Sequence, residues 1–478
     1  MGDLCEDPGG YLAPAVEWVD HYLGGIRELP VAHQVAPGDI TRALPEEAPA
    51  LGEDLRAALE DLDRILLPGV THWNHPRFFG YFGITGSLPG VAGELLAAAL
   101  NSNAMLWRTG PAATELEGVA TRWLSRLLGL PDWFGVIQDT ASSATFTALA
   151  AARHRVDPEV RRRGLAGRPP MAVYCSELAH SSVDKAVLGL GIGTDQVRHI
   201  AADGAFRMDP AALEAAIEAD VGTGVRPMAV VATVGTTAVT SVDPIPQIVD
   251  VCARHGLWLH IDGAYGAAAG AVPELRWVLE GASGADSLVV NPHKWLFVPV
   301  DCSVLYLADP EAARASLSVV PDYLAAPEDA PNLMDYGLPL GRRFRALKLW
   351  LVLRCLGTTG IRAALREHVR LAGLLAGWVE AEPGFDLAAP VPLSVVNFWP
   401  PPSYPGGAEA LATAVNANGF YVTTARVHGR PALHVAVGNL GTTEDDVRAL
   451  WALITQLVRE PAVSPAGSVG APGTSAGR

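Results

Sequence analysis

The fold is decided by two stretches of the sequence, Leu257-Trp-Leu-His-Ile-Asp-Gly-Ala-Tyr265 and Asp286-Ser-Leu-Val-Val-Asn-Pro-His-Lys-Trp295. Each is a short apolar run that ends in polar side chains, as is typical of a buried strand that leads into a loop. Similar runs alternate with helical periodicity between about residues 110 and 310. This alternation predicts an α/β fold with a mainly parallel central sheet, covered by helices on both faces. In such sheets ligands bind at the carboxyl ends of the strands.

The rest of the chain predicts three further parts. Residues 1–85 are expected to form a helical N-terminal segment that is too small for a core of its own and packs on a partner subunit. Residues 86–368 are expected to form the large domain, and residues 369–460 a small α+β C-terminal domain. Residues 461–478 are rich in Pro, Gly, Ser and Ala, so they bury too little apolar surface to fold and are expected to be a disordered tail.

Composition and charge argue against several classes of function. The 478 residues include 35 Lys and Arg against 51 Asp and Glu, and the net charge of −16 disfavours binding to nucleic acid or to an anionic membrane surface. No apolar run is long enough to span a membrane. The five cysteines are scattered without a CxxC pair, so neither a disulfide framework nor a metal site is predicted. The acidic first residues lack the features of a secretory signal, which predicts a cytoplasmic protein.

Lys294 and Asp262 are the residues with the clearest chemical potential. A lysine just after a buried strand, beside Asn291, His293 and Trp295, is partly desolvated, which lowers its pKa and makes it a nucleophile able to form a Schiff base. A carboxylate at the end of an apolar strand needs a cationic partner, and a protonated pyridine nitrogen would serve. Taken singly, each residue has an ordinary alternative: a solvated surface lysine, and a helix cap or structural ion pair.

Several motifs in the same order resemble one enzyme family. They are Asn291-Pro-His-Lys-Trp295 with Asp301-Cys-Ser303, Ala179-His-Ser-Ser-Val183, Val234-Gly-Thr-Thr237, and Pro339-Leu-Gly-Arg-Arg-Phe-Arg-Ala-Leu-Lys348. From about residue 11 to 458 the chain resembles the group II decarboxylases that depend on pyridoxal 5'-phosphate (PLP), specifically the aromatic-L-amino-acid decarboxylase branch. The resemblance implies the aspartate-aminotransferase-like PLP fold (fold type I) and a homodimer with its active site at the subunit interface.

Carried over residue by residue, the resemblance assigns the cofactor site. It implies Lys294 as the lysine that binds PLP covalently and Asp262 as the partner of the pyridine nitrogen. Ala264 would lie on one face of the ring, and His180, a candidate proton donor, on the other. Thr237 would contact the cofactor and the substrate carboxylate. The expected phosphate contacts are Ala141 and Ser142 at a helix N-terminus, Asn291, His293, Ser287, and Gly341 of the neighbouring subunit.

The substrate pocket is expected to be aromatic. The segment that contains Trp73, Tyr81 and Phe82 matches the family's pocket wall, although such a cluster could equally be a core or dimer-interface patch. Asn103 and Met105 match positions that reach the pocket across the dimer. Tyr323, in a Pro- and Ala-rich stretch expected to be a mobile loop, matches the lid tyrosine that separates decarboxylases from aldehyde synthases.

The sequence therefore predicts PLP-dependent decarboxylation of an L-amino acid to the amine and CO2. Tryptophan, tyrosine, phenylalanine or a hydroxylated relative is the expected substrate. Three alternatives stay open: an aromatic aldehyde synthase, a decarboxylase of a non-aromatic amino acid such as an acidic one, and a catalytically inactive PLP-binding protein. Lys294, Asp262 and His180 argue against the last of these.

Overall fold

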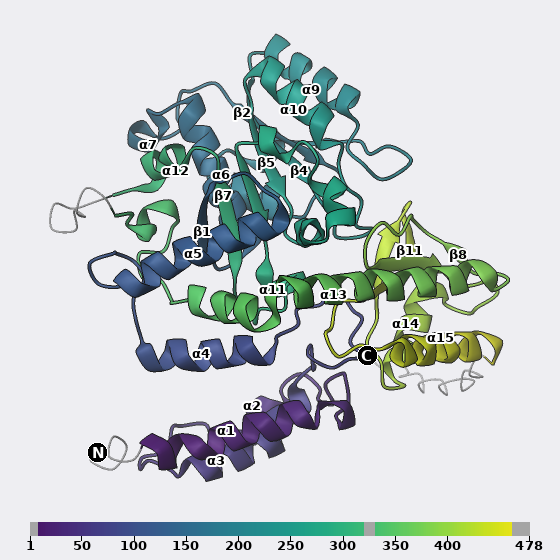
Figure 1. Ribbon diagram of the computed structural model, residues 1–478. Helices are drawn as coiled ribbons and strands as arrows, with labels where there is room; N and C mark the ends of the chain where they lie inside the picture. Colours follow the sequence, from purple (N-terminus) through teal and green to yellow (C-terminus); the bar gives the residue numbers. More distant parts are fainter. Residues whose placement is uncertain (1–7, 320–329, 461–478) are drawn as a thin grey trace, which may run out of the picture.

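A mainly parallel seven-stranded sheet forms the centre of the large domain (Figure 1). The computed structural model describes residues 8–319 and 330–460. The sheet order is β1-β7-β6-β5-β4-β2-β3, and β7 runs antiparallel to both of its neighbours while the other pairs are parallel. The strands are β1 (Phe134–Gln138), β2 (Met171–Ser176), β3 (Val197–Ile200), β4 (Arg226–Thr233), β5 (Trp258–Asp262), β6 (Ser287–Val290) and β7 (Ser303–Leu307). The predicted α/β class is confirmed.

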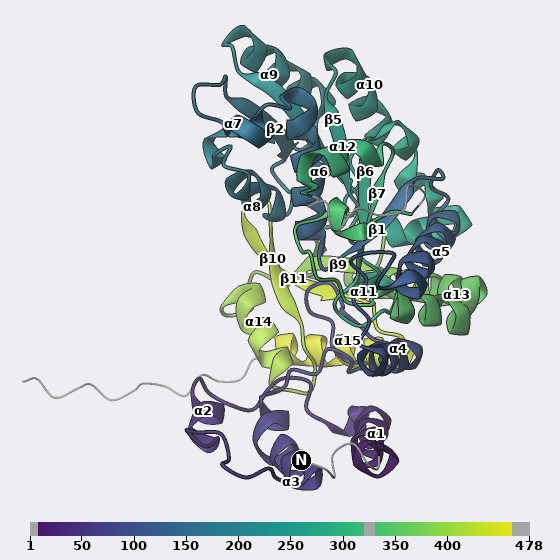
Figure 2. The same cartoon turned by 90° about the vertical axis from the view of Figure 1, so that its left-hand side faces the viewer.

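Helices cover both faces of this sheet, as Figures 1 and 2 show. One face packs against α6 (Ala141–Val156), α8 (Ser182–Gly189) and α12 (Pro310–Leu317). The other packs against α5 (Pro111–Leu128), α9 (Pro210–Gly222), α10 (Ile245–His255) and the first part of α13 (Ala346–Ala381). Two short helices complete the domain, α7 (Val160–Arg163) and α11 (Pro292–Trp295).

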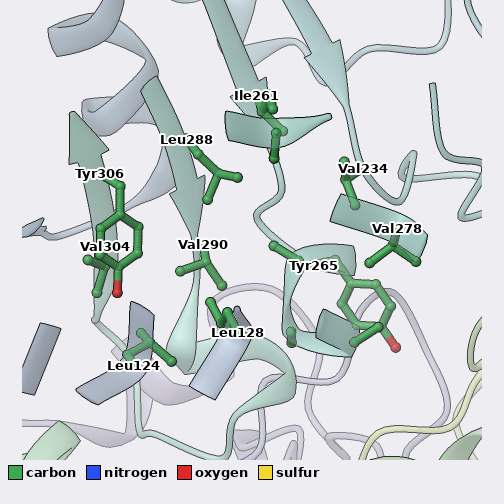
Figure 3. Close-up of a cluster of buried hydrophobic side chains, with 14 of the residues drawn as sticks. Leu124, Leu128, Val234, Ile261, Tyr265, Val278, Leu288, Val290, Val304 and Tyr306 are labelled. Atoms are coloured by element: carbon green, nitrogen blue, oxygen red, sulfur yellow. The ribbon is translucent and has the colours of Figure 1, made fainter. Parts of the chain in front are cut away.

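The central strands β4, β5 and β6 are mainly apolar because both of their faces are buried. Side chains alternate along a strand, so Leu288 and Val290 of β6 join one core cluster while Val289 joins the opposite one. Figure 3 shows Leu288 and Val290 in the first cluster together with Tyr306 of β7. The alternation also places Asp262 on the face of β5 opposite Ile261, toward α6.

The N-terminal segment stands apart from this body. Its helices α1 (Pro8–Gly24), α2 (Asp39–Ala43) and α3 (Leu55–Asp61) lie together at the base in Figures 1 and 2, beyond α4 (Leu88–Leu100). The predicted helical periodicity of this segment is therefore seen. Packing of these helices on a partner subunit stays a prediction.

The small C-terminal domain is built on an antiparallel sheet with the order β10-β11-β9-β8. Its elements are β8 (Asp386–Leu387), β9 (Val395–Trp399), α14 (Gly407–Asn416), β10 (Thr423–Val427), β11 (Arg430–Ala436) and α15 (Glu444–Arg459). Helix α13 links the two domains: Leu365 packs in the large-domain core, whereas Leu371 packs in the small-domain core. In the described residues no helix combines the length and the apolar character that crossing a membrane requires.

Candidate active site

A cavity of about 200 Å³ lies where the parallel strands of the large sheet end. Parallel strands present their carboxyl ends at one edge, so residues that are distant in the sequence meet there. The structure brings ten of the predicted site residues to this cavity: Phe82, Ala141, Ser142, His180, Thr237, Asp262, Ala264, Asn291, His293 and Lys294. Apart from Phe82, they end or follow strands β1, β2, β4, β5 and β6.

Lys294 lies in the single helical turn α11, directly after β6. Pro292 at the start of this turn supplies the fixed φ that begins a helix. The Lys294 Nζ is 5.1 Å from the centroid of the Phe82 ring. Burial lowers the pKa of the Lys294 ammonium, and the negative charge of Asp262 partly opposes that shift. At neutral pH, the share of Lys294 that is present as the neutral, nucleophilic amine is therefore larger than for a surface lysine.

Asp262 ends β5 as a buried carboxylate, with 6% of the residue exposed. Its Oδ1 accepts a hydrogen bond from the Ala264 N–H at 3.1 Å, which orients the carboxylate toward the cavity that both residues line. A buried carboxylate is stable only with hydrogen bonds or a cationic partner. Asp262 is therefore suited to bind a cationic ring nitrogen in this cavity.

His180 lies at the open side of the cavity, in the loop between β2 and α8. Its Nδ1 accepts a hydrogen bond from the Ser182 N–H at 3.1 Å, so in the neutral ring the proton is on Nε2. Burial lowers the pKa of His180; Asp262 opposes this shift, and Lys294 adds to it. The structure therefore leaves Nε2–H as the group of His180 that can donate a hydrogen bond or a proton.

Asn291 and His293 are oriented by the start of β7. The Ser303 hydroxyl donates to Asn291 Oδ1 at 2.6 Å, which leaves the Nδ2 donors of Asn291 for the cavity. The Cys302 N–H donates to His293 Nδ1 at 2.9 Å, and burial lowers the pKa of His293 to about 4, so this ring is neutral with its proton on Nε2. Both side chains therefore offer hydrogen-bond donors and no negative charge.

The N-terminus of α6 adds backbone donors to the same cavity. Thr140 caps this helix by accepting a hydrogen bond from the Ser143 N–H at 3.4 Å. Ala141 and Ser142 occupy the first turn, where N–H groups have no partner within the helix and the helix dipole favours an anion. This end of the cavity is therefore suited to a phosphate group, even though the chain is strongly acidic.

Three parallel aromatic rings form the wall beside Lys294. The rings of Phe82 and Tyr265 stack with centroids 3.9 Å apart, and those of Tyr265 and Trp295 with centroids 4.8 Å apart. The Tyr265 hydroxyl is hydrogen-bonded to the hydroxyl of Ser394, and the Trp295 Nε1–H donates to His368 Nδ1 at 3.0 Å. Ser394 of the small domain and His368 of the linking helix α13 therefore hold this wall in place.

The prediction for Ser287 is corrected by the structure. Ser287 begins β6, and three residues at ~3.3 Å each separate it from the carboxyl end of that strand, a distance of about 10 Å. Its Oγ accepts from the Trp258 Nε1–H at 2.9 Å and is 2.9 Å from His260 Nδ1. Ser287 therefore ties β5 to β6 inside the core and does not line the cavity.

Trp73 and Tyr81, two of the three predicted aromatic wall residues, do not line this cavity in the single chain, and their contact with a substrate stays a prediction. Trp73 and Tyr81 stack on each other with centroids 5.6 Å apart, and Tyr81 is 52% exposed. Trp73 lines a separate cavity of about 350 Å³ together with Tyr22. Phe82 is the predicted aromatic residue that reaches Lys294.

The residues predicted to act across the dimer form one surface cluster. The Arg342 N–H donates to Asn103 Oδ1 at 3.0 Å, and Asn103 Nδ2 lies 3.2 Å from the Met105 sulfur. Gly341 precedes Arg342 and is exposed. These residues do not line the cavity of their own chain. Tyr323 lies outside the described residues, as does the predicted tail at 461–478.

Thr233, Thr140, Gly235 and Tyr265 line the cavity but were not singled out from the sequence. Tyr265 belongs to a strand-end run that was recognised in the sequence, so its position was a usable signal. Thr233 is 4% exposed, and its Oγ1 has no hydrogen-bond partner in the described part of the chain.

These observations fit a PLP molecule. The cavity has hydrogen-bond donors for a phosphate at the α6 end, a carboxylate for a ring nitrogen, and an amine of lowered pKa for an aldehyde carbon. The buried hydroxyl of Thr233, without a partner, lies on the same cavity wall. Thus the donor set, the acceptor and the nucleophile match the three polar parts of PLP.

Buried histidines make the free energy of unfolding depend on pH. Burial lowers the pKa of His75, His260, His293 and His368 from 6.5 to about 4. Between these values the unfolded chain binds protons that the folded chain does not, so the stability from the neutral histidines is present above pH 6.5 and is lost as the pH falls toward 4. Asp243 opposes this trend, because burial raises its pKa to about 6.

We therefore expect the cofactor-free chain to lose several kcal/mol of unfolding free energy between pH 7 and pH 5, at ~1.4 kcal/mol per pKa unit for each histidine. Urea unfolding at the two pH values measures the loss. His260→Phe should make the dependence shallower, because it removes one of these titrating groups. A free energy that is constant or rises on acidification would contradict the expectation.

Comparisons with known proteins agree with this geometry. The pyridoxal-dependent decarboxylase conserved domain matches residues 37–400. Tyrosine decarboxylase of Oryza sativa subsp. japonica is 38% identical over 475 residues, which cover 92% of this chain and 89% of that protein. Phenylacetaldehyde synthase of Arabidopsis thaliana is 35% identical over 461 residues, covering 92% of this chain and 94% of that one.

A solved structure extends the likeness to three dimensions. The crystal structure of Oryza sativa TDC with PLP and tryptamine matches with a TM-score of 0.92 and 33% sequence identity, covering 96% of this chain and 99% of that chain. The fold is therefore fold type I, as predicted, and the cofactor is PLP. With the domain match extending over most of its length, the chain belongs to the family of pyridoxal-dependent decarboxylases.

Proposed function

We propose that this chain removes the carboxyl group of an aromatic L-amino acid as CO2 and releases the amine. The observation that carries the proposal is the meeting of Lys294, Asp262 and His180 in one cavity that also offers donors for a phosphate. An inactive PLP-binding protein would have no need for a nucleophilic amine and a proton donor around the same space.

Each polar residue has a distinct role in this proposal. When bound, PLP supplies an electron sink for the electron pair that remains after CO2 leaves. Lys294 holds the cofactor through its amine and exchanges with the substrate amine. Asp262 keeps the proton on the ring nitrogen, and His180 Nε2–H donates a hydrogen bond or proton from the open side of the cavity. Asn291, His293 and the α6 N-terminus bind the phosphate.

The aromatic substrate class is supported by the wall beside Lys294. The rings of Phe82 and Tyr265 line the cavity, and Trp295 stacks on Tyr265 from the buried interior. This rigid, apolar wall favours a flat apolar side chain next to the reacting atoms. The relative from rice is a tyrosine decarboxylase, and the rice structure contains tryptamine. A non-aromatic substrate stays the alternative. The cytoplasmic location remains a prediction from the sequence.

An aldehyde synthase is the second candidate function, because the phenylacetaldehyde synthase of Arabidopsis thaliana is 35% identical. Such an enzyme consumes O2 and gives aldehyde, ammonia and hydrogen peroxide instead of amine. Tyr323, which matches the lid tyrosine of the decarboxylases, favours the amine product.

One product assay decides between these functions. The PLP-loaded protein is incubated with each of the twenty amino acids, DOPA and 5-hydroxytryptophan, and CO2, amine, aldehyde and peroxide are measured. CO2 and amine in equal amounts from aromatic substrates support the proposal. Aldehyde with peroxide as the main products would establish the synthase, and CO2 release confined to non-aromatic substrates would overturn the aromatic assignment.

We also propose that the active protein is a homodimer. Tyr11, Leu12 and Val16 of α1 and Leu96 and Leu100 of α4 are exposed apolar residues, which a partner subunit would cover. The cluster of Asn103, Met105 and Gly341 would then face the partner's cavity.

Sedimentation should therefore give about twice the chain mass of 50.2 kDa. Leu96→Glu places a charge on the exposed face of α4, so it should weaken the dimer and lower activity at low protein concentration. Val221→Glu, at an exposed apolar position of α9 on the far side of the molecule, is the control and should leave the mass unchanged (Figure 1). An active monomer would contradict the proposal.

A further inference from the structure

Thr233 is a buried residue of the cavity wall whose side chain has no partner. It ends β4, is 4% exposed, and its hydroxyl makes no hydrogen bond in the described residues. Its backbone is fully engaged: the N–H donates to Asp243 Oδ2 at 2.7 Å, and the C=O accepts from the Asp243 N–H at 2.9 Å. Asp243 therefore fixes the backbone of Thr233, and the Thr233 hydroxyl remains available for a further hydrogen bond.

The carboxylate of Asp262, next to Thr233 in the sheet, can accept more hydrogen bonds than it receives from the described residues. Thr233 and Asp262 are register partners in the parallel pair β4–β5, and both line the same cavity. In the described residues the Asp262 side chain accepts one hydrogen bond, from the Ala264 N–H. A carboxylate can accept about four. Hence an unused donor lies beside an unused acceptor, on one face of the sheet.

Filling the cavity makes this pairing favourable. A bound ring excludes water from Asp262, and an unpaired buried hydroxyl costs about 1–3 kcal/mol. Rotation of the threonine side chain between staggered positions moves its hydroxyl without moving the backbone that Asp243 holds. A hydrogen bond to an ionised group is also stronger than one between neutral groups.

We propose that Thr233 is a further positioning residue of the PLP site, whose hydroxyl donates to the Asp262 carboxylate in the loaded enzyme. This hydrogen bond directs the Asp262 carboxylate at the ring nitrogen. The inference rests on the proposed role of Asp262. It predicts that Thr233 affects cofactor binding through Asp262 and not through packing.

The test measures the dissociation constant of PLP for the cofactor-free protein, by quenching of its tryptophan fluorescence. Thr233→Val keeps the shape and removes the hydroxyl, so the dissociation constant should rise about tenfold or more, as expected for one hydrogen bond to a charged group. Thr233→Ser keeps the hydroxyl and should stay within about threefold of wild type.

Thr114→Val is the matched control. Thr114 is also 4% exposed, and its Oγ1 also has no partner in the described residues, but it lies on α5 and does not line the cavity. This variant should bind PLP as wild type does. Melting temperatures of both valine variants should equal or exceed that of wild type, because each loses an unpaired buried hydroxyl.

A double-mutant cycle separates Thr233 from general packing. In an Asp262→Asn background the charged acceptor is gone, so Thr233→Val should change the dissociation constant less than about threefold. The inference is overturned if Thr233→Val binds PLP as wild type does, if Thr233→Ser is as weak as Thr233→Val, or if the loss persists in the Asp262→Asn background. Failure of the wild-type protein to bind PLP or release CO2 would instead refute the proposed function.

Discussion

Lys294→Ala is expected to lower the rate of amine release by about 1000-fold or more, with the fold retained. Alanine cannot form the covalent bond to the cofactor, and removal of one side chain from a cavity wall disturbs little packing. Lys294→Arg should be equally inactive, because a guanidinium keeps the positive charge but is not a nucleophile at neutral pH. The pair of variants therefore separates the covalent role of Lys294 from its charge.

The small number of lysines makes it easy to assign a covalent label to one residue. The chain has three: Lys185, Lys294 and Lys348. Lys185 is exposed on α8, and Lys348 is buried in an ion pair with Glu94. Borohydride reduction of the PLP-loaded protein should label the peptide that contains Lys294, and Lys185→Ala should change neither labelling nor rate. Activity of Lys294→Ala within tenfold of wild type would refute the assignment.

Asp262→Asn is expected to lower kcat by roughly 100-fold or more and to weaken PLP binding, because an amide has nearly the same shape but cannot hold the ring nitrogen protonated. Steady-state CO2 release and PLP titration measure the two effects. The effect on kcat should exceed that on KM, since Asp262 is proposed to bind the ring nitrogen of the cofactor and not the substrate.

Asp286→Asn is the control for Asp262→Asn. Asp286 precedes the neighbouring strand β6 and pairs with Arg155 at 2.6 Å, outside the cavity. Its replacement should reduce stability slightly and leave kcat unchanged. An unchanged kcat in Asp262→Asn would show that another residue holds the ring nitrogen.

Local pattern was sufficient to predict the central strands and the polar residues at their ends, whereas the proposed roles of Asp262 and Lys294 came from the resemblance of their motifs to the family. The runs that ended at Asp262 and led to Lys294 are buried on both faces, so their apolar character is continuous and the polar residue after each marks the edge of the sheet. Strand β1 was harder to recognise, because Phe134–Gln138 contains Gly135 and is only partly buried. Its assignment depends on pairing with β7, far along the chain.

The motifs also identified which residues could contact a cofactor, but not all of their positions. Ser287 and Asn291 are four residues apart, yet Ser287 begins β6 inside the core and Asn291 follows its end at the cavity. Similarly, Trp73, Tyr81 and Phe82 lie in one aromatic segment, and Phe82 is the one that stacks on Tyr265 beside Lys294. Sequence spacing cannot separate such neighbours, because strand direction and chain reversal decide where each side chain points.

By itself, the sequence determined the α/β class and the mainly parallel strands, because these depend on local periodicity. The proposed roles of Lys294 and Asp262 came from the resemblance of their motifs to the family, because residue types at strand ends left other interpretations open. Only the tertiary structure decided which donors are free, such as His180 Nε2–H, and that Thr233 has a hydroxyl to spare next to Asp262. Hydrogen-bond satisfaction is a property of neighbours brought together from distant strands, so no local pattern encodes it.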